Sequence, residues 1–186
     1  MKEVITMKKV HKMTIAGLNR ELPLCPINDK LDIAAFIMFS DVELTVASAE
    51  ELLKIVPDFD VLLTAETKGI PLAYEMARQS GKPYVAARKS VKLYMQNPVF
   101  VTVKSITTEG VQTLYLSEDD ANMLKGRRVL IVDDVISTGE SLSALEALCS
   151  KVDAPVCGKA AVLAEGDAAK STEKVFLEEL PLFYKE

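Results

Sequence analysis

Histidine and cysteine are scarce in this sequence. His11 is the one histidine, and the cysteines are Cys25, Cys149 and Cys157. A single histidine argues against a serine-histidine-aspartate triad and against a histidine-rich metal site. The cysteines form neither a CxxC pair nor a zinc-ligand spacing, so we interpret them as free thiols in a reducing compartment. The sequence thus predicts a cytoplasmic protein.

Long apolar runs and an excess of positive charge are also absent. No run approaches the roughly 18–20 apolar residues of a membrane span, and the N-terminal string MKEVITMKKVHKM lacks the apolar centre of a signal peptide. With 22 Lys and Arg against 27 Asp and Glu, the net charge is −5, and no basic arm or stripe is visible. We therefore expect neither a membrane nor a nucleic acid as partner. A small anionic ligand at one local site remains compatible with this charge.

The order of apolar and polar segments indicates a single α/β domain over residues 1–186. The composition, 49% hydrophobic and 26% charged, is that of an ordinary globular protein. Short apolar strands alternate with amphipathic helices, which is typical of a mainly parallel sheet flanked by helices. The predicted strands are 60–65, 83–89, 128–132 and 158–167, and the predicted helices are 141–152 and 71–81, the latter ended by Gly81.

The segments outside this alternation of strands and helices predict further elements. Residues 8–24 alternate loosely and predict a β-hairpin or a pair of short strands. The apolar run within 25–39 fits a helix or a strand. Ser48 and Glu51 fit a capping box that opens a helix closed by Pro57. The remaining expectations are β arms at 99–106 and 111–116 within a long insertion, a helical or looped connector at 117–126, and a last strand at 174–183.

The string RRVLIVDDVISTGES, residues 127–141, carries the clearest functional signal. Asp133 and Asp134 follow an apolar strand, at the edge where parallel sheets bind their ligands. The hydroxyl-rich turn that comes next, with Gly139, exposes backbone N–H groups at a helix N-terminus, where phosphate binds. Carboxylates suit sugar hydroxyls or a divalent metal instead. Together they predict a site for a phosphorylated ribose, although an Asx turn that ends an ordinary strand has the same local pattern.

The same string resembles the signature of type I phosphoribosyltransferases for 5-phosphoribosyl-1-pyrophosphate (PRPP). LLTAETKGIPLAYEMARQSGKPYVAARKSVKLYM, residues 62–95, is also similar to adenine phosphoribosyltransferases, in which Glu-x-Arg-Gly precedes a helix and an Arg-Lys pair follows the next strand. The resemblance covers a core of about residues 60–165. It implies the type I phosphoribosyltransferase fold: a central, mainly parallel sheet flanked by helices, a flexible β-hairpin loop at 90–116, and a small base-binding hood at about 1–45.

The resemblance also implies a role for each motif residue. Asp133 and Asp134 would hold the ribose hydroxyls, directly or through Mg²⁺. The 5′-phosphate would lie on Val135, Ile136, Ser137, Thr138, Gly139, Glu140 and Ser141, and the pyrophosphate on Thr67, Lys68, Gly69, Arg88, Lys89 and Lys92. The catalytic set would be Asp133, Asp134, Arg88 and Lys89. Taken alone, the Arg-Lys pair also fits a solvated strand end, and the Thr-Lys-Gly string also fits a helix-opening turn.

The hood and one strand end supply the candidates for contact with the base. These are Asn28, Phe36 and Glu165, although Phe36 also fits a plain core position. Hypoxanthine-guanine enzymes of the family carry aspartate at the position of Ser137, so the resemblance favours adenine over those bases.

Two stretches depart from the adenine enzymes. Glu140 stands where the family has glycine, but its backbone N–H remains available for the phosphate. Residues 103–117, VKSITTEGVQTLYLS, are nearer to xanthine phosphoribosyltransferases and to purine-operon repressors, and Glu109 is the one carboxylate of the hairpin.

The resemblance thus implies a purine phosphoribosyltransferase of nucleotide salvage. It would transfer ribose 5-phosphate from PRPP to a purine base, with adenine favoured, use Mg²⁺, and form a homodimer. Two alternatives stay open. The base could be xanthine, or the protein could be a PRPP-sensing regulator that resembles the purine repressors and lacks catalysis.

Overall fold

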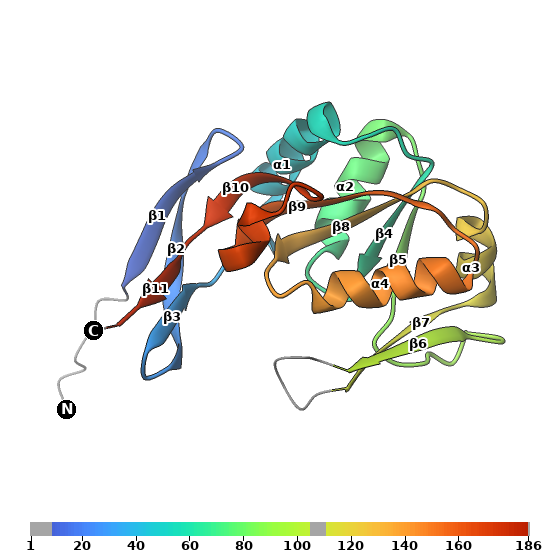
Figure 1. Ribbon diagram of the computed structural model, residues 1–186. Coiled ribbons are helices and arrows are strands. Elements are labelled where there is room, and N and C mark those ends of the chain that lie inside the picture. Colours follow the sequence, from blue (N-terminus) through green and yellow to red (C-terminus); the bar gives the residue numbers. More distant parts are fainter. Residues whose placement is uncertain (1–8, 105–110, 186) are drawn as a thin grey trace.

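Parallel strands form the centre of the molecule. The computed structural model describes residues 9–104 and 111–185, and its five-stranded central sheet has the order β10-β9-β8-β4-β5 (Figure 1). The strands are β4 (Val61–Ala65), β5 (Tyr84–Ala87), β8 (Val129–Ile136), β9 (Val156–Glu165) and β10 (Val175–Leu180). All neighbouring pairs in this sheet are parallel, so the predicted α/β fold is confirmed.

Side chains of the central strands alternate between two hydrophobic clusters. One face is covered by α1 (Val42–Ile55) and α2 (Ile70–Ser80), and the other by α4 (Glu140–Lys151) (Figure 1). In β8, Leu130 and Val132 pack on the side of α1 and α2, whereas Val129 and Ile131 pack on the side of α4. All four are fully buried. Because successive strand residues face opposite sides, burial on both faces requires the continuous apolar run that the sequence has here.

Helix α1 begins at Val42, so the capping box predicted at Ser48 is wrong. Asp41 caps the helix instead, and its side chain accepts a hydrogen bond from the Leu44 N–H at 3.1 Å. Ser48 lies inside the helix and is fully buried. The Ser-x-x-Glu string fits a cap locally, but the apolar face of the helix extends further toward the N-terminus than that string indicates.

A four-stranded antiparallel sheet, the hood, lies beside the central sheet (Figure 1). Its order is β1-β2-β3-β11, with β1 (Val10–Ile15), β2 (Leu18–Asn28), β3 (Leu31–Ala34) and β11 (Leu182–Tyr184). The hairpin predicted at 8–24 is confirmed by β1 and β2, which turn at Ala16 and Gly17 with φ of 49° and 79°. The apolar run of 25–39 contributes strand β3 and no helix.

The single strand predicted at 174–183 is in fact two strands in different sheets. β10 continues the central sheet, and β11 pairs with β3 of the hood. Pro181 lies between them. Proline has no N–H for a sheet ladder, so the chain leaves the first sheet at this residue.

The insertion after β5 is a β-hairpin, as predicted. Strands β6 (Val99–Lys104) and β7 (Val111–Leu116) pair antiparallel, and the hairpin tip with Glu109 lies outside the described residues. Lys151 of α4 holds the hairpin by donating to the Phe100 carbonyl at 2.7 Å. The connector that follows is the helix α3 (Glu118–Leu124), and a short 3₁₀-helix, Gly166–Lys170, follows β9.

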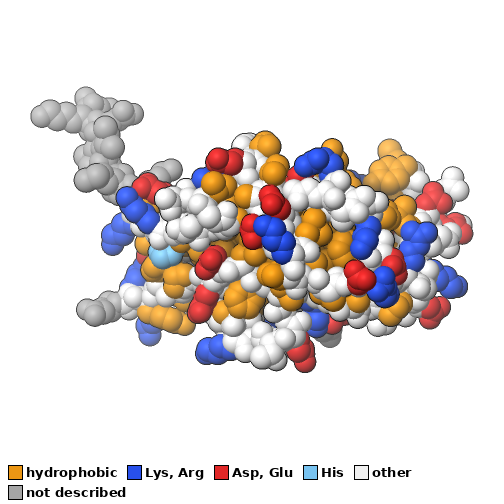
Figure 2. Space-filling view, turned by 90° about the horizontal axis from the view of Figure 1, so that it is seen from above, with side chains coloured by type: hydrophobic (Ala, Val, Ile, Leu, Met, Phe, Trp, Pro, Cys, Tyr) orange, Lys and Arg blue, Asp and Glu red, His pale blue; other side chains and the backbone are white. Residues whose placement is uncertain are grey.

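Charged side chains of both signs are spread over the surface that Figure 2 shows. Neither sign forms a broad patch on that face, and apolar side chains lie between the charges. None of the helices in the described part of the chain combines the length and the apolar character needed to cross a membrane.

Candidate active site

The carboxyl ends of neighbouring parallel strands bring the predicted site segments together. Strand β4 leads into residues 67–69, β5 into 88–92, and β9 ends at Glu165, while Asp133 and Asp134 lie within β8. Strand β8 extends beyond the acidic pair to Ile136, so the predicted strand end at residue 132 is corrected. We name residues 67–69 the Lys68 turn, residues 137–139 the phosphate turn and residues 88–92 the cationic segment.

Two adjoining hollows open at these strand ends. The larger, of about 260 Å³, is lined by Ala65, Glu66, Thr67, Lys68, Lys89, Asp133, Asp134, Val135, Ser137 and Ser141. The smaller, of about 40 Å³, is lined by Asp133, Val135, Ile136, Ser137, Thr138, Gly139, Glu140, Ser141 and Leu142. Because they share Asp133, Val135, Ser137 and Ser141, the hollows are two parts of one site, here called the cavity. All residues of the predicted sugar and 5′-phosphate set, 133–141, line it.

The acidic pair lies at the floor of the cavity. Asp134 is 2% exposed, and its Oδ2 lies 3.2 Å from Lys68 Nζ. The Asp134 N–H donates to Asp133 Oδ1 at 2.9 Å. Burial, and next the negative charge of Asp134, raise the pKa of Asp133 to about 7. The two buried carboxyl groups are therefore suited to binding a cation or hydroxyl donors.

The phosphate turn joins β8 to the N-terminus of α4. Gly139 has φ of 81° and directly precedes the helix, which begins at Glu140. A positive φ favours glycine, and the amides that begin the helix have no partner one turn back. Glu140 lies in the first helical turn, where a negative charge suits the helix dipole, and its backbone N–H remains at the helix N-terminus as a candidate donor to phosphate.

Gly69 lets the Lys68 turn lie directly on the acidic pair. A Cβ at this position would overlap Thr64 Oγ1 and lie 2.9 Å from Asp133 Oδ1. Real Cβ atoms do not approach other atoms so closely, so any other residue here would force the Thr64 and Asp133 side chains to move. The close approach explains how Lys68, one residue before, reaches Asp134.

The cationic segment gathers around Glu66, a residue that the sequence analysis did not place in the site. The Lys89 N–H donates to Glu66 Oε2 at 3.0 Å, and ion pairs of 3.8 Å and 3.7 Å join Arg88 Nη2 and Lys92 Nζ to the same carboxylate. Lys89 is part of the cavity lining, whereas Arg88 and Lys92 are not part of it and contact its Glu66 side chain. The position of Glu66, immediately before the Lys68 turn, is the feature of the sequence that could have indicated its place in the site.

The three candidates for base contact lie in three different surroundings. Glu165 is half-buried; burial raises its pKa, and the nearby charge of Lys68 opposes that rise. Phe36 is 4% exposed and packs in the core, so its ring offers no free face to a purine. The Asn28 side chain accepts from the Lys30 N–H at 2.8 Å in the β2–β3 turn and lines a separate hollow. Glu165 alone of the three lies close to the cavity residues.

A divalent cation fits the acidic pair. Asp134 Oδ2 is buried without a hydrogen-bond partner in the described part of the chain and forms an ion pair with Lys68. No group of three or more His, Cys, Asp or Glu that could hold a metal occurs among the described residues. One or two carboxylates with the remaining positions left to water and phosphate oxygens is the donor set that suits Mg²⁺ and not Zn²⁺.

These features place the molecule in a class, the α/β proteins whose ligand site lies at the carboxyl ends of parallel strands and at a helix N-terminus. Within this class, the family model described as phosphoribosyl transferase domain matches residues 45–180. The chain belongs to that family, which confirms the prediction of a phosphoribosyltransferase.

Relatives of known name agree with the expectation of a purine phosphoribosyltransferase. An adenine phosphoribosyltransferase of Rhodococcus jostii is 37% identical over 68% of this chain and 69% of its own length. A hypoxanthine/guanine phosphoribosyltransferase of Methanothermus fervidus is 32% identical over 63% of this chain and 58% of its own. The purine biosynthesis transcriptional repressor PurR of Bacillus subtilis is 34% identical over 54% of this chain and 35% of its own. The names therefore do not decide the base.

The fold is also that of solved adenine phosphoribosyltransferases. The crystal structure of the enzyme from Thermoanaerobacter pseudethanolicus matches with a TM-score of 0.71 at 20% identity, over 85% of this chain and 95% of that one. At this identity the match concerns the fold, and it confirms the predicted type I phosphoribosyltransferase architecture.

Proposed function

We propose that this protein transfers ribose 5-phosphate from PRPP to a purine base, with adenine preferred, and releases pyrophosphate. The observation that carries the proposal is a single cavity in which the acidic pair lies between the phosphate turn and Lys89. PRPP has the same order of groups: a phosphate, then vicinal hydroxyls, then a pyrophosphate. The product would be a nucleoside monophosphate, as in purine salvage.

In this mechanism the chain acts mainly by positioning and by charge. The bond from C1 of the ribose to pyrophosphate breaks with its electron pair on the leaving oxygen. A purine nitrogen bonds to C1, and its proton passes to the released pyrophosphate, directly or through water. Asp133 and Asp134 orient the ribose hydroxyls, and Lys68, Arg88 and Lys89 offset the charge that develops on pyrophosphate. The β6–β7 hairpin would close over the cavity and exclude water.

Mg²⁺ is the cofactor that we propose. Asp133 and Asp134 would hold it, directly or through water, together with oxygens of the substrate. The chemistry that the ion would supply there is the neutralisation of phosphate charge. The buried Asp134 oxygen without a hydrogen-bond partner among the described residues supports this assignment.

We further propose a cytoplasmic homodimer. Val91, Leu93 and Tyr94 expose large apolar side chains next to Lys92, and exposed apolar side chains in series are typical of a contact surface. The cysteines are free thiols, in keeping with a reducing compartment. Light scattering on the purified protein tests the dimer, and a monomer at micromolar concentration would contradict it.

The direct test is pyrophosphate release with PRPP, Mg²⁺ and adenine, hypoxanthine, guanine or xanthine in separate reactions. We expect release with adenine at the highest kcat/KM. The highest value with xanthine would move the assignment to a xanthine enzyme. No release with any base would refute the transferase proposal.

A second candidate function is a PRPP-binding regulator without turnover. The observation that favours it is the 34% identity with the repressor PurR over 101 residues. This candidate predicts PRPP binding without pyrophosphate release, together with DNA binding that weakens steeply as salt rises. Titration calorimetry with PRPP and a gel-shift series at two salt concentrations separate the two functions.

A further inference from the structure

Glu66 occupies a position where a carboxylate needs an explanation. It lies between β4 and the Lys68 turn, and it lines the part of the cavity where the proposed function places pyrophosphate. Its side chain is 20% exposed. A fixed negative charge in the wall of a pyrophosphate site weakens binding by repulsion unless neighbouring groups neutralise it.

The neighbours of Glu66 are the groups of the cationic segment. The Lys89 N–H donates to its Oε2 at 3.0 Å, and Arg88 Nη2 and Lys92 Nζ lie 3.8 Å and 3.7 Å from its carboxylate oxygens. The Glu66 N–H in turn donates to the Ala87 carbonyl at 2.8 Å. The Lys89 amide first, and then the cationic side chains, lower the pKa of Glu66, so it stays ionised at neutral pH.

The cationic segment has anchors besides Glu66, on its backbone and at Lys92, whose Nζ donates to Ser90 Oγ at 2.9 Å. Arg88 exchanges two backbone hydrogen bonds of 2.8 Å with Tyr115 of the β6–β7 hairpin. Arg88 Nε is buried and has no hydrogen-bond partner within the described residues, so the guanidinium keeps an unused donor. Glu66 is the residue of the cavity lining that contacts all three of the Lys89 amide, the Arg88 guanidinium and the Lys92 ammonium.

We propose that Glu66 is a positioning residue for pyrophosphate. It holds the Lys89 amide, Arg88 and Lys92 beside the cavity before substrate arrives, and it acts through them without touching the reacting atoms. This inference rests on the proposed function, because it names the residue that prepares the leaving-group end of the same site.

The test is calorimetric titration of pyrophosphate, and separately of ribose 5-phosphate, in the presence of Mg²⁺. Glu66→Ala should weaken pyrophosphate binding about tenfold, the size of a lost charge-assisted hydrogen bond, and should leave ribose 5-phosphate binding within about twofold. Glu66→Gln keeps an acceptor for the Lys89 N–H and should restore most of the affinity. Glu51→Ala, which removes an exposed carboxylate paired with Lys54 on α1, should change neither affinity.

Amide hydrogen exchange of the free protein provides a readout without ligand. The Lys89 amide should exchange faster in Glu66→Ala and at the original rate in Glu66→Gln. Unchanged exchange, or pyrophosphate binding that is equal or tighter in Glu66→Ala, would overturn the inference. Failure of the unmodified protein to bind pyrophosphate and ribose 5-phosphate would instead refute the proposed function itself.

Discussion

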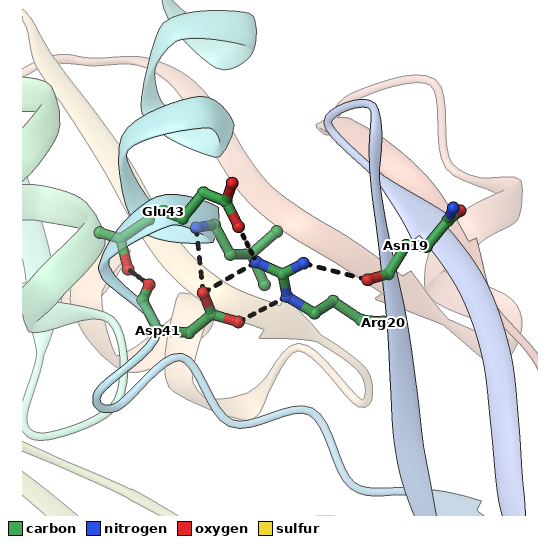
Figure 3. Close-up of polar contacts among 6 residues, drawn as sticks. Asn19, Arg20, Asp41 and Glu43 are labelled. Carbon is green, nitrogen blue, oxygen red and sulfur yellow. Dashed lines mark hydrogen bonds and ion pairs between the residues drawn. The ribbon is translucent and has the colours of Figure 1, made fainter.

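Arg20 of the hood donates to both carboxylate oxygens of Asp41, the residue that caps helix α1 (Figure 3). The distances are 2.7 Å from Nε and 3.0 Å from Nη2, and Nη2 also lies 2.8 Å from Glu43 Oε2. Asp41 accepts in addition from the Leu44 N–H. The Asp41 carboxylate therefore caps helix α1 and also forms an ion pair with Arg20. This ion pair connects the hood to the part of the molecule that contains the central sheet.

Removing this cation should loosen the hood. We expect Arg20→Met to lower the free energy of unfolding by about 1 kcal/mol, because the pair is bidentate and partly shielded from water. Urea denaturation monitored by circular dichroism measures the change. Lys12→Met, which breaks an exposed hood pair with Glu21, is the matched control and should cost less than about 0.5 kcal/mol. Equal losses in both variants would argue against a special role for Arg20.

The same pair predicts an acid-dependent part of the stability. Hydrogen bonds from Arg20 hold the pKa of Asp41 below its ordinary value of 3.8. A carboxyl whose pKa is lowered by folding adds stability above its unfolded pKa and loses it as the pH falls through the folded pKa. Asp41→Asn keeps the helix cap and removes the charge. Its deficit in unfolding free energy should be full at pH 7 and disappear below the lowered pKa. A deficit that is constant with pH would contradict the assignment.

Asp134 should be required for turnover but not for folding. We expect Asp134→Asn to lower kcat/KM by about 10²-fold or more, since the carboxylate faces the ribose and the proposed cation. The partner left behind, Lys68, is 54% exposed and can turn to water, so the midpoint of urea unfolding should hardly move. Asp167→Asn, at an exposed pair with Lys170, is the control and should leave kinetics unchanged.

Gly69 and Gly81 should respond to alanine in opposite ways. At Gly69 the added methyl meets Thr64 and Asp133, so Gly69→Ala should displace the Lys68 turn and raise KM for PRPP. At Gly81 the space is open, but φ is 69°. Gly81→Ala should therefore cost about 1 kcal/mol of stability with unchanged kinetics. Unchanged KM in Gly69→Ala would show that the turn tolerates the shift.

Glu140 gives a simpler prediction for the phosphate turn. Glu140→Gly keeps the backbone N–H at the start of α4, so affinity for PRPP should stay the same or improve. Calorimetric titration with PRPP and Mg²⁺ measures it. A much weaker affinity would reveal a positive role of the glutamate side chain.

The sequence predicts best those elements whose pattern lies within one stretch of consecutive residues. The apolar runs around Leu63 and Ile131 and the string from Asp133 to the phosphate turn each carry their own pattern, and the parallel sheet follows from them. Long-range packing decided the rest. The Asp41 cap of α1 is bonded to Arg20, which is 21 residues away in the hood, and Glu66 meets Lys89 because β4 and β5 are neighbours.

Asn28 and Phe36 illustrate why base contacts were the weakest prediction. Nothing in the local string tells whether a hood side chain faces the cavity, the core or the β2–β3 turn, since that depends on how the hood sheet packs. The position of Glu165 was easier to predict, because it ends a parallel strand and the carboxyl ends of such strands lie at the ligand-binding edge of the sheet.

The pairing of β11 with β3 has a consequence for how the molecule is made. On the ribosome, β3 emerges before the whole central sheet, whereas its partner emerges after it. One edge of the hood thus stays open throughout synthesis, with unpaired N–H and C=O groups that invite wrong partners. The hood can be completed only after every strand of the central sheet has been synthesised.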